Sequence, residues 1–520
     1  MKYLLYRRSL LLCGKFERFS SGKSFIKINR KSFGEPMISK RLLFTFLTVP
    51  VIAIILYCAV NPVTGEKELM LYSEEDEIQL GIQTDKQIQA TYGIYDDPQL
   101  TEYISELGHE LAAKTHRPEL DYHFRILDTP VVNAFAVPGG YIYFTRGILA
   151  YFNNEAEMAG VLAHELGHVA ARHSMSQYSK ATLAQLGLGL GTILSEDFRE
   201  IAGLAQFGVS LLFLKFSRDD ERQSDALGVE YSVKAGYDAR EMATFFNTLQ
   251  RLHSGGNGNT LPEWASTHPN PADRSESILA DYQEWQEKVS GPAEKINREI
   301  YLNHINNLAF GNDPKQGYVK ENAFYHPELR FVFPIPANWQ VNNLPSQVQM
   351  IPKEQDATIL MMLAEGNSLD EAADKFIADT KADVKQIDAI RVHSLEGRRI
   401  LSIVGTGEDA LNLMSHFIAK DNRIYALHGV AKPESYAAYV DEFRRVLNNF
   451  RDLDDQSKIN VQVDRLVLRT VSSASSLQQV LQAWGIPQND RESTAILNGM
   501  DLSEQVKRGQ KIKVINRNFP

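Results

Sequence analysis

Five consecutive residues, His164-Glu165-Leu166-Gly167-His168, have the types and the spacing that metal-dependent hydrolysis needs. Side chains four residues apart project from the same face of an α-helix, so the two histidines of this HExxH motif can share one metal ion. Glu165 lies beside them and is a candidate base for a water molecule. If it lies on a helix, this run predicts most of a zinc hydrolase site.

The surrounding sequence predicts a helix that begins near Asn153-Asn154. Either asparagine can cap a helix, and Glu155 and Glu157 follow in the first turn, where acidic side chains are favourable. Apolar residues then recur at helical spacing, at Met158, Val161, Leu162, Leu166 and Val169. We therefore expect both histidines on one helical face.

A catalytic zinc ion takes three protein ligands and keeps one position for water, so a third ligand must come from elsewhere. The segment Ser217–Ala226 is the best source, because Glu221 and Asp225 are again four residues apart. We assign Glu221 to the metal and Asp225 to the ring N–H of a ligand histidine. The alternatives are a structural zinc site and a charged helix without metal. Structural sites usually use cysteines, and Cys13 and Cys58 lie far upstream.

Two further histidines lie near these motifs. His173 follows His168 by five residues, which rotates it away from the ligand face and predicts a surface or packing residue. His268 belongs to the proline-rigid segment Ser266–Arg274, where a core histidine would be unusual. We interpret His268 as a pocket residue that stabilises the oxyanion or approaches the zinc in the resting state. A plain loop histidine is the alternative.

An apolar segment, Asn133–Phe144, is broken by Pro138-Gly139-Gly140 and resumes as alternating aromatics, which predicts an edge strand and a hairpin. Main-chain pairing with such an edge would hold an extended substrate with weak sequence preference. The hairpin can also simply pack on the active helix, and both roles are compatible. The residues predicted to bind substrate are Asn133, Ala134, Phe135, Ala136, Gly139 and Gly140.

Four motifs follow one another in the chain: Asn133–Gly140, His164–His168, Ser217–Glu221 with Asp225, and Thr267–Arg274. In this order they resemble the gluzincin zinc metallopeptidase family of the CAAX prenyl endopeptidases. The resemblance is closest to its soluble bacterial branch, the BepA-type envelope proteases, with the HtpX-type heat-shock proteases as relatives. It covers about half of the chain, from roughly Asn61 to Ala309.

The resemblance implies a role for each matching residue. His164, His168 and Glu221 would bind one Zn²⁺ per chain, and Glu165 would be the catalytic acid and base. Asp225 would orient the site, His268 would face the metal, and Arg274 would anchor the His-Pro loop. The chain departs from the family in lacking the many membrane spans of the prenyl and heat-shock branches, and in lacking a helical-repeat tail.

The N-terminal region predicts export. Residues 1–36 are basic, with nine Lys or Arg and two acidic residues. This composition is typical of an organelle transit peptide, but a start codon assigned too far upstream also explains it, and we favour Met37 as the first residue. Residues 37–60 are typical of a signal peptide or single membrane anchor, with an uncharged run from Leu42 to Val60. Lipidation of Cys58 is a further alternative. We expect the body on the periplasmic side of a bacterial envelope, anchored in the membrane or released.

The net charge of −10 argues against nucleic-acid binding. The chain has 520 residues, which is too long for one hydrophobic core, so we expect several domains. We predict a mainly α-helical zincin-type metalloprotease domain with a small edge sheet at 61–312. An α+β domain at 313–453, with helices on one side of its sheet, has a loose similarity to PsbP/Mog1-like domains. A βααβ module at 460–520 is similar to LysM modules, which implies peptidoglycan binding or a structural cap. The apolar region 183–214 predicts a buried helical hairpin or lid beside the cleft.

The leading hypothesis is a zinc metalloendopeptidase, a hydrolase that cleaves misfolded or surplus envelope proteins in protein quality control. Edge-strand capture fits such substrates, because it needs several residues in extended form. The alternative is a non-proteolytic chaperone or cell-wall-associated scaffold with the same fold. The intact Glu165 and the full ligand set argue against that alternative.

Overall fold

The computed structural model describes residues 58–185, 216–255, 264, 268, 274–344 and 346–517. They fall into two compact units, which we call the helix-rich unit (Cys58–Phe333, Asn343–Ser346 and Asp452–Pro520) and the sheet unit (Pro334–Asn342 and Gln347–Arg451). The predicted anchor up to residue 57 and the predicted hairpin or lid from residue 186 lie outside the described residues. Among the described helices, none has the length and apolar character to span a membrane.

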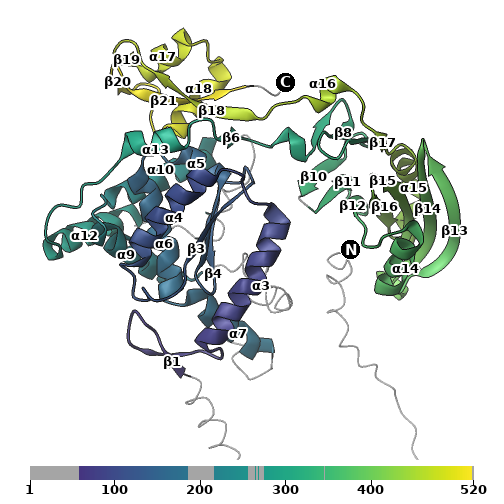
Figure 1. Cartoon of the computed structure of the whole chain (residues 1–520), viewed down its shortest axis with the longest axis horizontal. Helices are drawn as coiled ribbons and strands as arrows, with labels where there is room; N and C mark the ends of the chain where they lie inside the picture. The colour runs from purple at the N-terminus through teal and green to yellow at the C-terminus, as the bar shows by residue number, and fades with distance from the viewer. Residues whose placement is uncertain are drawn as a thin grey trace, which may run out of the picture. The chain divides into compact units, whose positions relative to one another are not determined.

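The helix-rich unit contains a three-stranded sheet between helices (Figure 1). The middle strand β5 (Tyr141–Thr145) pairs in parallel with β3 (His123–Leu127) and antiparallel with β4 (Ala134–Val137). A small hairpin of β1 (Cys58–Val60) and β2 (Lys67–Leu69) begins this unit. The helices that precede its C-terminal residues are α3 (Glu74–Tyr92), α4 (Pro98–Ala112), α5 (Arg146–Tyr151), α6 (Glu155–Ala170), α7 (His173–Gln185), α9 (Arg218–Lys234), α10 (Arg240–Gly255), α12 (Arg274–Lys288) and α13 (Arg298–His304).

The predicted hairpin is confirmed, and β4 is an edge strand of the three-stranded sheet. Gly139 and Gly140 both have positive φ, at 79° and 88°, which favours glycine in the turn. The turn packs against α3 so closely that a Cβ added to Gly81 would lie 2.2 Å from the carbonyl oxygen of Pro138. The hairpin is therefore fixed at its tip by α3.

The predicted helix around the two histidines is also confirmed. α6 begins after Asn154, whose side chain accepts a hydrogen bond from the backbone N–H of Glu157 at 2.8 Å. All of its residues are buried, so its polar side chains cannot be satisfied by bulk water. Each must find a partner inside the protein.

Polar contacts fix both ends of α6. At the N-terminal end, the Glu155 carboxylate accepts hydrogen bonds from the hydroxyls of Tyr103 (2.5 Å) and Tyr237 (2.9 Å) and from the Asn297 amide (2.6 Å). At the C-terminal end, Arg117 donates to the carbonyl oxygen of Val169 at 3.1 Å. Helix ends carry unpaired backbone groups, so these contacts hold α6 where its own hydrogen bonding stops.

The sheet unit contains a seven-stranded sheet in the order β10-β11-β12-β16-β15-β14-β13, with the helices α14 (Leu369–Thr380) and α15 (Pro433–Leu447). Its strands are β10 (Gln340–Leu344), β11 (Gln347–Ile351), β12 (Ala357–Leu363), β13 (Asp383–Val392), β14 (Leu395–Val404), β15 (Leu411–Lys420) and β16 (Arg423–Ala431). Apart from this sheet, a four-stranded sheet made mostly of residues assigned to the helix-rich unit has the order β17 (Arg451–Asp452), β9 (Phe331–Pro334), β8 (Ala323–His326) and β7 (Tyr318–Lys320).

The prediction that the helices lie on one side of this sheet is wrong. His428 of β16 stacks on Phe376 of α14, with ring centroids 5.0 Å apart. The next residue, Gly429, faces α15, because a Cβ added there would lie 2.4 Å from the ring of Phe443. Successive strand residues point to opposite faces, so each face of the sheet is covered by one helix.

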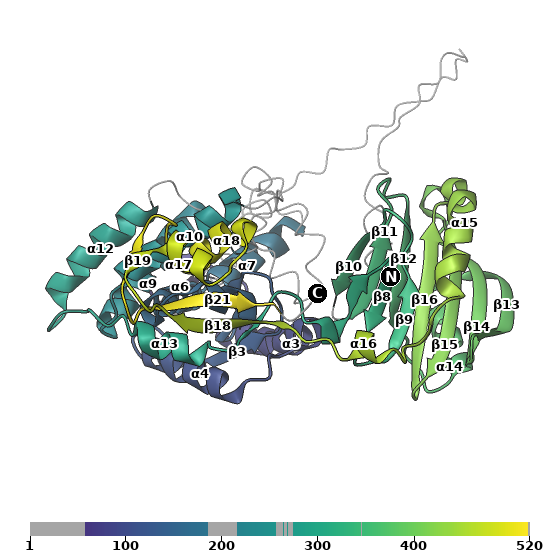
Figure 2. The same cartoon turned by 90° about the horizontal axis from the view of Figure 1, so that it is seen from above.

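The C-terminal residues form β18 (Asp464–Thr470), α17 (Leu477–Ala483), α18 (Gln488–Leu497) and β21 (Lys511–Asn516), which confirms the predicted βααβ order. This C-terminal module follows the short helix α16 (Gln456–Ile459) and also contains the two-residue strands β19 (Ser475–Ser476) and β20 (Gln505–Val506). Figure 2 shows β18 and β21 side by side. β18 also pairs with β6 (Ala309–Phe310), so the module continues a sheet of the helix-rich unit.

Lys513 of β21 fastens this module to the start of α6. Its side chain is fully buried, and its ammonium group donates to the carbonyl oxygens of Ala150 (2.8 Å) and Phe152 (2.7 Å). Ala150 lies in the last turn of α5 and Phe152 follows that helix, just before Asn154, the cap of α6. The C-terminal module therefore helps to position the helix that carries the HExxH motif.

We predict that Lys513→Met destabilises the helix-rich unit by about 2–4 kcal/mol, because it leaves two buried carbonyl oxygens without their donor and removes one of the positive charges near Glu157. Urea unfolding followed by tryptophan fluorescence measures the change. Lys511→Met is the matched control on the same strand, since Lys511 makes a partly exposed ion pair with Glu299 and its loss should cost less than about 1 kcal/mol. Equal effects of the two substitutions would contradict the anchoring role.

Candidate metal centre

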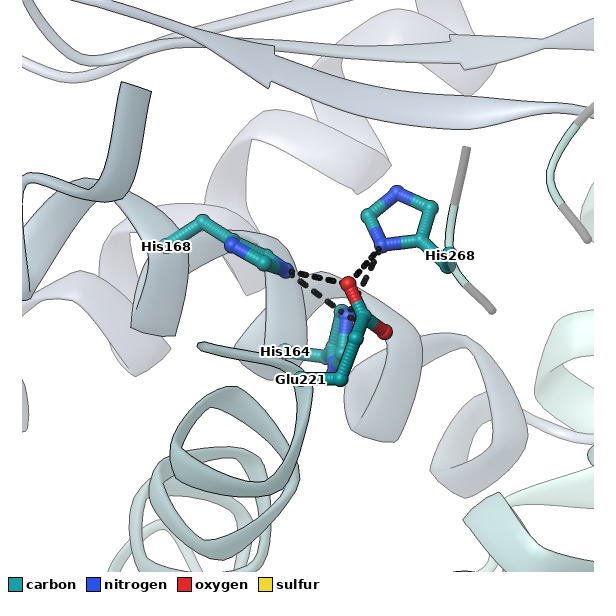
Figure 3. A group of neighbouring side chains, drawn as sticks. All are labelled: His164, His168, Glu221 and His268. Atoms are coloured by element: carbon teal, nitrogen blue, oxygen red, sulfur yellow. Dashed lines mark hydrogen bonds and ion pairs between the residues drawn. The ribbon is translucent and has the colours of Figure 1, made fainter. Parts of the chain in front are cut away.

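Four buried side chains converge in the helix-rich unit: His164, His168, Glu221 and His268 (Figure 3). His164 and His168 come from α6, and Glu221 comes from the first turn of α9. The capping residue Ser217 accepts from the backbone N–H of Asp220, which fixes the start of α9. One ligand atom from each of the four residues lies within 4.8 Å of the other three.

The distances between these atoms fit a single zinc ion. Bonds of about 2.0–2.1 Å in tetrahedral geometry place ligand atoms about 3.3 Å apart. His164 Nε2 lies 3.1 Å from His168 Nε2, and His168 Nε2 lies 3.5 Å from Glu221 Oε1. His268 Nδ1 lies 3.4 Å from His164 Nε2 and 2.9 Å from Glu221 Oε1. The structure brings the predicted ligands together, with His268 as a fourth donor.

The charges of the group also fit a cation. Burial lowers the pKa of His164 to about 3 and that of His168 to about 4, so both rings are neutral. Burial raises the pKa of Glu221, but the facing histidines outweigh it and hold the pKa well below the usual value. Neutral imidazole and ionised carboxylate are the forms that bind metal. Glu221 Oε1 faces the imidazoles, while Oε2 has no hydrogen-bond partner among the described residues and lies 3.6 Å from the guanidinium of Arg274.

Asp225 orients His164, as predicted from its spacing to Glu221. Asp225 Oδ1 lies 2.9 Å from His164 Nδ1 and accepts from Arg274 at 2.5 Å. A proton on Nδ1 leaves the lone pair of His164 Nε2 free on the side of the cluster. Burial raises the pKa of Asp225 to about 6, although Arg274 opposes the shift.

Aromatic rings position Arg274 and His268, and sequence reasoning missed them. The guanidinium carbon of Arg274 lies 4.0 Å from the ring centroid of Phe246 and 4.9 Å from that of Trp264. Trp264 in turn stacks on His268, with ring centroids 4.8 Å apart and planes 19° apart. Nothing in a single sequence shows that Phe246 of α10 and Trp264 meet, because this contact depends on the tertiary fold.

Glu165 is buried against the ligand cluster and is only partly satisfied. Its Oε1 accepts from the indole N–H of Trp264 at 3.4 Å and lies 3.7 Å from His268 Nε2. Its Oε2 has no hydrogen-bond partner within the described part of the chain. A buried carboxylate oxygen without a partner is costly, which identifies this atom as the place where a proton or a water molecule can be received.

His173 has the packing role of its two predicted roles and is not a member of the ligand cluster, but it contacts His168, which its spacing did not predict. Its side chain is buried, and its Nδ1 lies 3.0 Å from Nδ1 of His168. The prediction assumed a continuous helix, but α6 ends at Ala170 and Arg172 has a left-handed φ of 58°. The rotation per residue therefore does not apply beyond α6. An HxxxxH spacing after the motif is the signal that could have found this residue.

The predicted substrate residues divide into two groups. Asn133 accepts from the backbone N–H of Thr145, so positions 133, 135 and 137 pair with β5. The main chain of Ala134 and Ala136 faces the other edge of β4, which pairs with no strand among the described residues, although the backbone N–H of Trp264 donates to Val132, just before β4, at 3.3 Å. Gly139 and Gly140 contact α3 and Asp121 instead, as turn residues. Substrate binding by these residues remains a prediction.

The arrangement of two histidines on one helix and a glutamate on a second is that of the zincin metallopeptidases. Residues 98–281 match the model of Peptidase family M48, which confirms the metallopeptidase resemblance. The beta-barrel assembly-enhancing protease of Escherichia coli is 29% identical over 245 residues, which cover 45% of this chain and 49% of that protein. The mitochondrial metalloendopeptidase OMA1 of Arabidopsis thaliana is 32% identical over 240 residues, 45% of each chain.

The chain therefore spans about half the length of these curated relatives. Among solved structures, cyanobacterial PsbP (CyanoP) from Synechocystis sp. PCC 6803 matches 25% of this chain and 91% of its own length, at 11% identity and a TM-score of 0.23. A score this low carries no argument, so the PsbP-like and LysM-like assignments remain predictions.

We predict that His268→Ala lowers zinc affinity only modestly, because the three other donors remain in place. Chelator competition at equilibrium measures the affinity, and His164→Ala is the comparison that should abolish binding. Turnover should change in the His268 variant while the metal stays bound. Loss of the metal from that variant would show that His268 is an essential ligand.

Proposed function

We propose that this chain is a zinc-dependent endopeptidase that hydrolyses misfolded or surplus proteins of the bacterial cell envelope. The observation that carries the proposal is the buried Glu165, which follows His164 in the chain, lies 3.7 Å from His268 of the donor cluster and has an Oε2 without a hydrogen-bond partner among the described residues. A structural metal site would not need a buried, half-satisfied carboxylate at its side. The match to Peptidase family M48 supports the same activity.

Different residues bind the metal and transfer the proton during peptide hydrolysis. When held by His164, His168 and Glu221, zinc lowers the pKa of a water molecule and polarises the carbonyl of the scissile bond. Glu165 takes the proton of the attacking water and passes it to the nitrogen of the leaving amine. Trp264 donates to Oε1 of Glu165 and so restrains the carboxylate, while Oε2 has no partner among the described residues and is left to accept the proton.

His268 lies where the water has to bind. Its Nδ1 is 2.9 Å from Glu221 Oε1 and 3.4 Å from His164 Nε2, which is the spacing of a fourth ligand. Of its two predicted roles, this position favours the approach to zinc in the resting state over stabilisation of the oxyanion. We therefore propose that His268 withdraws before water and substrate enter.

The free edge of β4 is the proposed substrate-binding element. The strand lies against α6, since the side chain of Ala134 belongs to the same core as Leu162 and Leu166. An extended substrate that paired with Ala134 and Ala136 would run alongside the helix that carries Glu165. Only a polypeptide without stable structure can offer such a segment, which supports unfolded proteins as substrates.

The compartment and the further partners are proposals from the sequence. The relatives include a bacterial and a mitochondrial enzyme, and the basic N-terminus with its apolar run supports export and a membrane anchor. Of the two readings of the C-terminal module, we propose the structural cap, because Lys513 and β18 join it to the helix-rich unit. Peptidoglycan binding is the alternative.

We predict that Glu165→Gln retains zinc but loses casein cleavage by about 10²–10⁴-fold, because the amide cannot accept the proton of the water. Zinc content and the release of labelled casein fragments are measured on the full chain. Glu106→Gln, an exposed glutamate of α4, is the control and should leave both unchanged. Full activity of the Glu165 variant would refute the mechanism. Zinc-loaded wild-type protein that cleaves no unfolded substrate would favour the chaperone or scaffold.

A second prediction concerns the edge strand. Ala136→Pro removes one outward N–H, which an edge position tolerates, and should lower casein cleavage about 10-fold through the loss of a substrate hydrogen bond. Ala136→Ser keeps the N–H and serves as the matched control. Zinc binding should be equal in both variants. Undiminished cleavage by the proline variant would show that substrate does not pair with this edge.

A further inference from the structure

His173 lies against His168 and is not part of the ligand cluster. The two Nδ1 atoms are 3.0 Å apart, and the His168 atom that faces the cluster is the other ring nitrogen, Nε2. The rings are nearly perpendicular, with planes 74° apart and centroids at 5.0 Å, which is an edge contact through nitrogen and not a stack. A contact of this length between two ring nitrogens requires one to donate and the other to accept.

The protons in this contact are fixed by the neighbours on α9. Nε2 of His173 lies 2.8 Å from Gln223 Oε1, an acceptor, so this nitrogen carries a proton. A neutral imidazole has only one N–H, which makes Nδ1 of His173 an acceptor. Ser224 Oγ lies 3.3 Å from the same Nδ1 and can donate to it as well. His168 must then carry its proton on Nδ1, and its Nε2 lone pair faces the cluster.

The fold gives His173 little freedom to leave this position. Arg172 turns the chain from α6 into α7 with a left-handed φ of 58°, and its guanidinium donates to the buried Glu77 at 2.7 Å. His173 is the first residue of α7, while Gln223 and Ser224 follow Glu221 on α9. The contact thus joins the segment after the HExxH helix to the helix that carries the glutamate.

We propose that His173 is a positioning residue of the metal site, which holds His168 in the tautomer and orientation that direct Nε2 at the metal. This inference rests on the proposed zinc site. Asp225 holds His164 through Nδ1 in the same way, at 2.9 Å. The two histidines of the motif are thus oriented by unlike partners, one by a carboxylate and the other by a neutral imidazole.

The test compares two substitutions in the full chain. His173→Leu removes the acceptor, whereas His173→Asn has nearly the same shape and places an amide oxygen close to the position of Nδ1. Loss of a partner behind a metal ligand typically weakens metal binding about 10–100-fold, so we expect that loss for leucine and near wild-type affinity for asparagine. Zinc affinity is measured by chelator competition, and the absorption spectrum of the Co²⁺-loaded protein reports the ligand geometry. His428→Leu, which removes another buried histidine, should leave zinc binding unchanged.

If His173→Leu does not fold, Gln223→Met still tests the proposal. This substitution removes the acceptor of His173 Nε2 without changing any atom that contacts His168, so we expect zinc affinity to fall, but by less than in His173→Leu. Unchanged affinity in both the leucine and the methionine variants would overturn the proposal, and equal losses for leucine and asparagine would assign His173 to packing alone. If the wild-type chain bound no zinc, the proposed function itself would fail.

Discussion

Burial of α6 is the constraint on which the rest of the structure depends. Every residue of this helix is inaccessible to solvent, yet it carries three glutamates and two histidines. Buried polar groups must find partners, and each partner ties the helix to another part of the unit. Glu155 is satisfied by two tyrosines and an asparagine, and Arg117 pairs with the last turn. Of the three glutamates of α6, only Glu165 has a buried oxygen without a hydrogen-bond partner among the described residues, at the point where chemistry is required.

The same burial sets the electrostatics of the site. Without water, His164 and His168 stay neutral and can offer lone pairs, while the carboxylate of Glu221 stays ionised because imidazoles surround it. Arg274 lies over Phe246 and pairs with Asp225 at 2.5 Å, and it is farther from Glu221 Oε2, at 3.6 Å. An ionised carboxylate and two preoriented lone pairs result, and this is the combination that binds a divalent cation.

The parts that could be predicted from sequence are those with a local cause. The cap at Asn154, the histidines of α6 and the carboxylates of α9 follow from helical spacing and were found. His173 was expected to pack or lie at the surface away from the ligands; it packs, but against His168, because a left-handed residue ends the helical rotation before it. Trp264 was missed because its hydrogen-bond partner, Glu165, is distant in sequence. In the sheet unit, β16 is buried on both faces and β13 is largely exposed, so neither shows the alternation that identifies a half-buried strand.

The central claim is that the position of α6 directs two imidazoles and one glutamate of α9 at a single cation. X-ray absorption at the zinc edge of the purified full chain tests it most directly, since the spectrum reports the atoms bound to the metal. We predict a first shell of nitrogen and oxygen at about 2.0–2.1 Å, with the outer-shell scattering of at least two imidazoles. Protein that holds no stoichiometric zinc, or a first shell that contains sulfur at about 2.3 Å, would contradict the account.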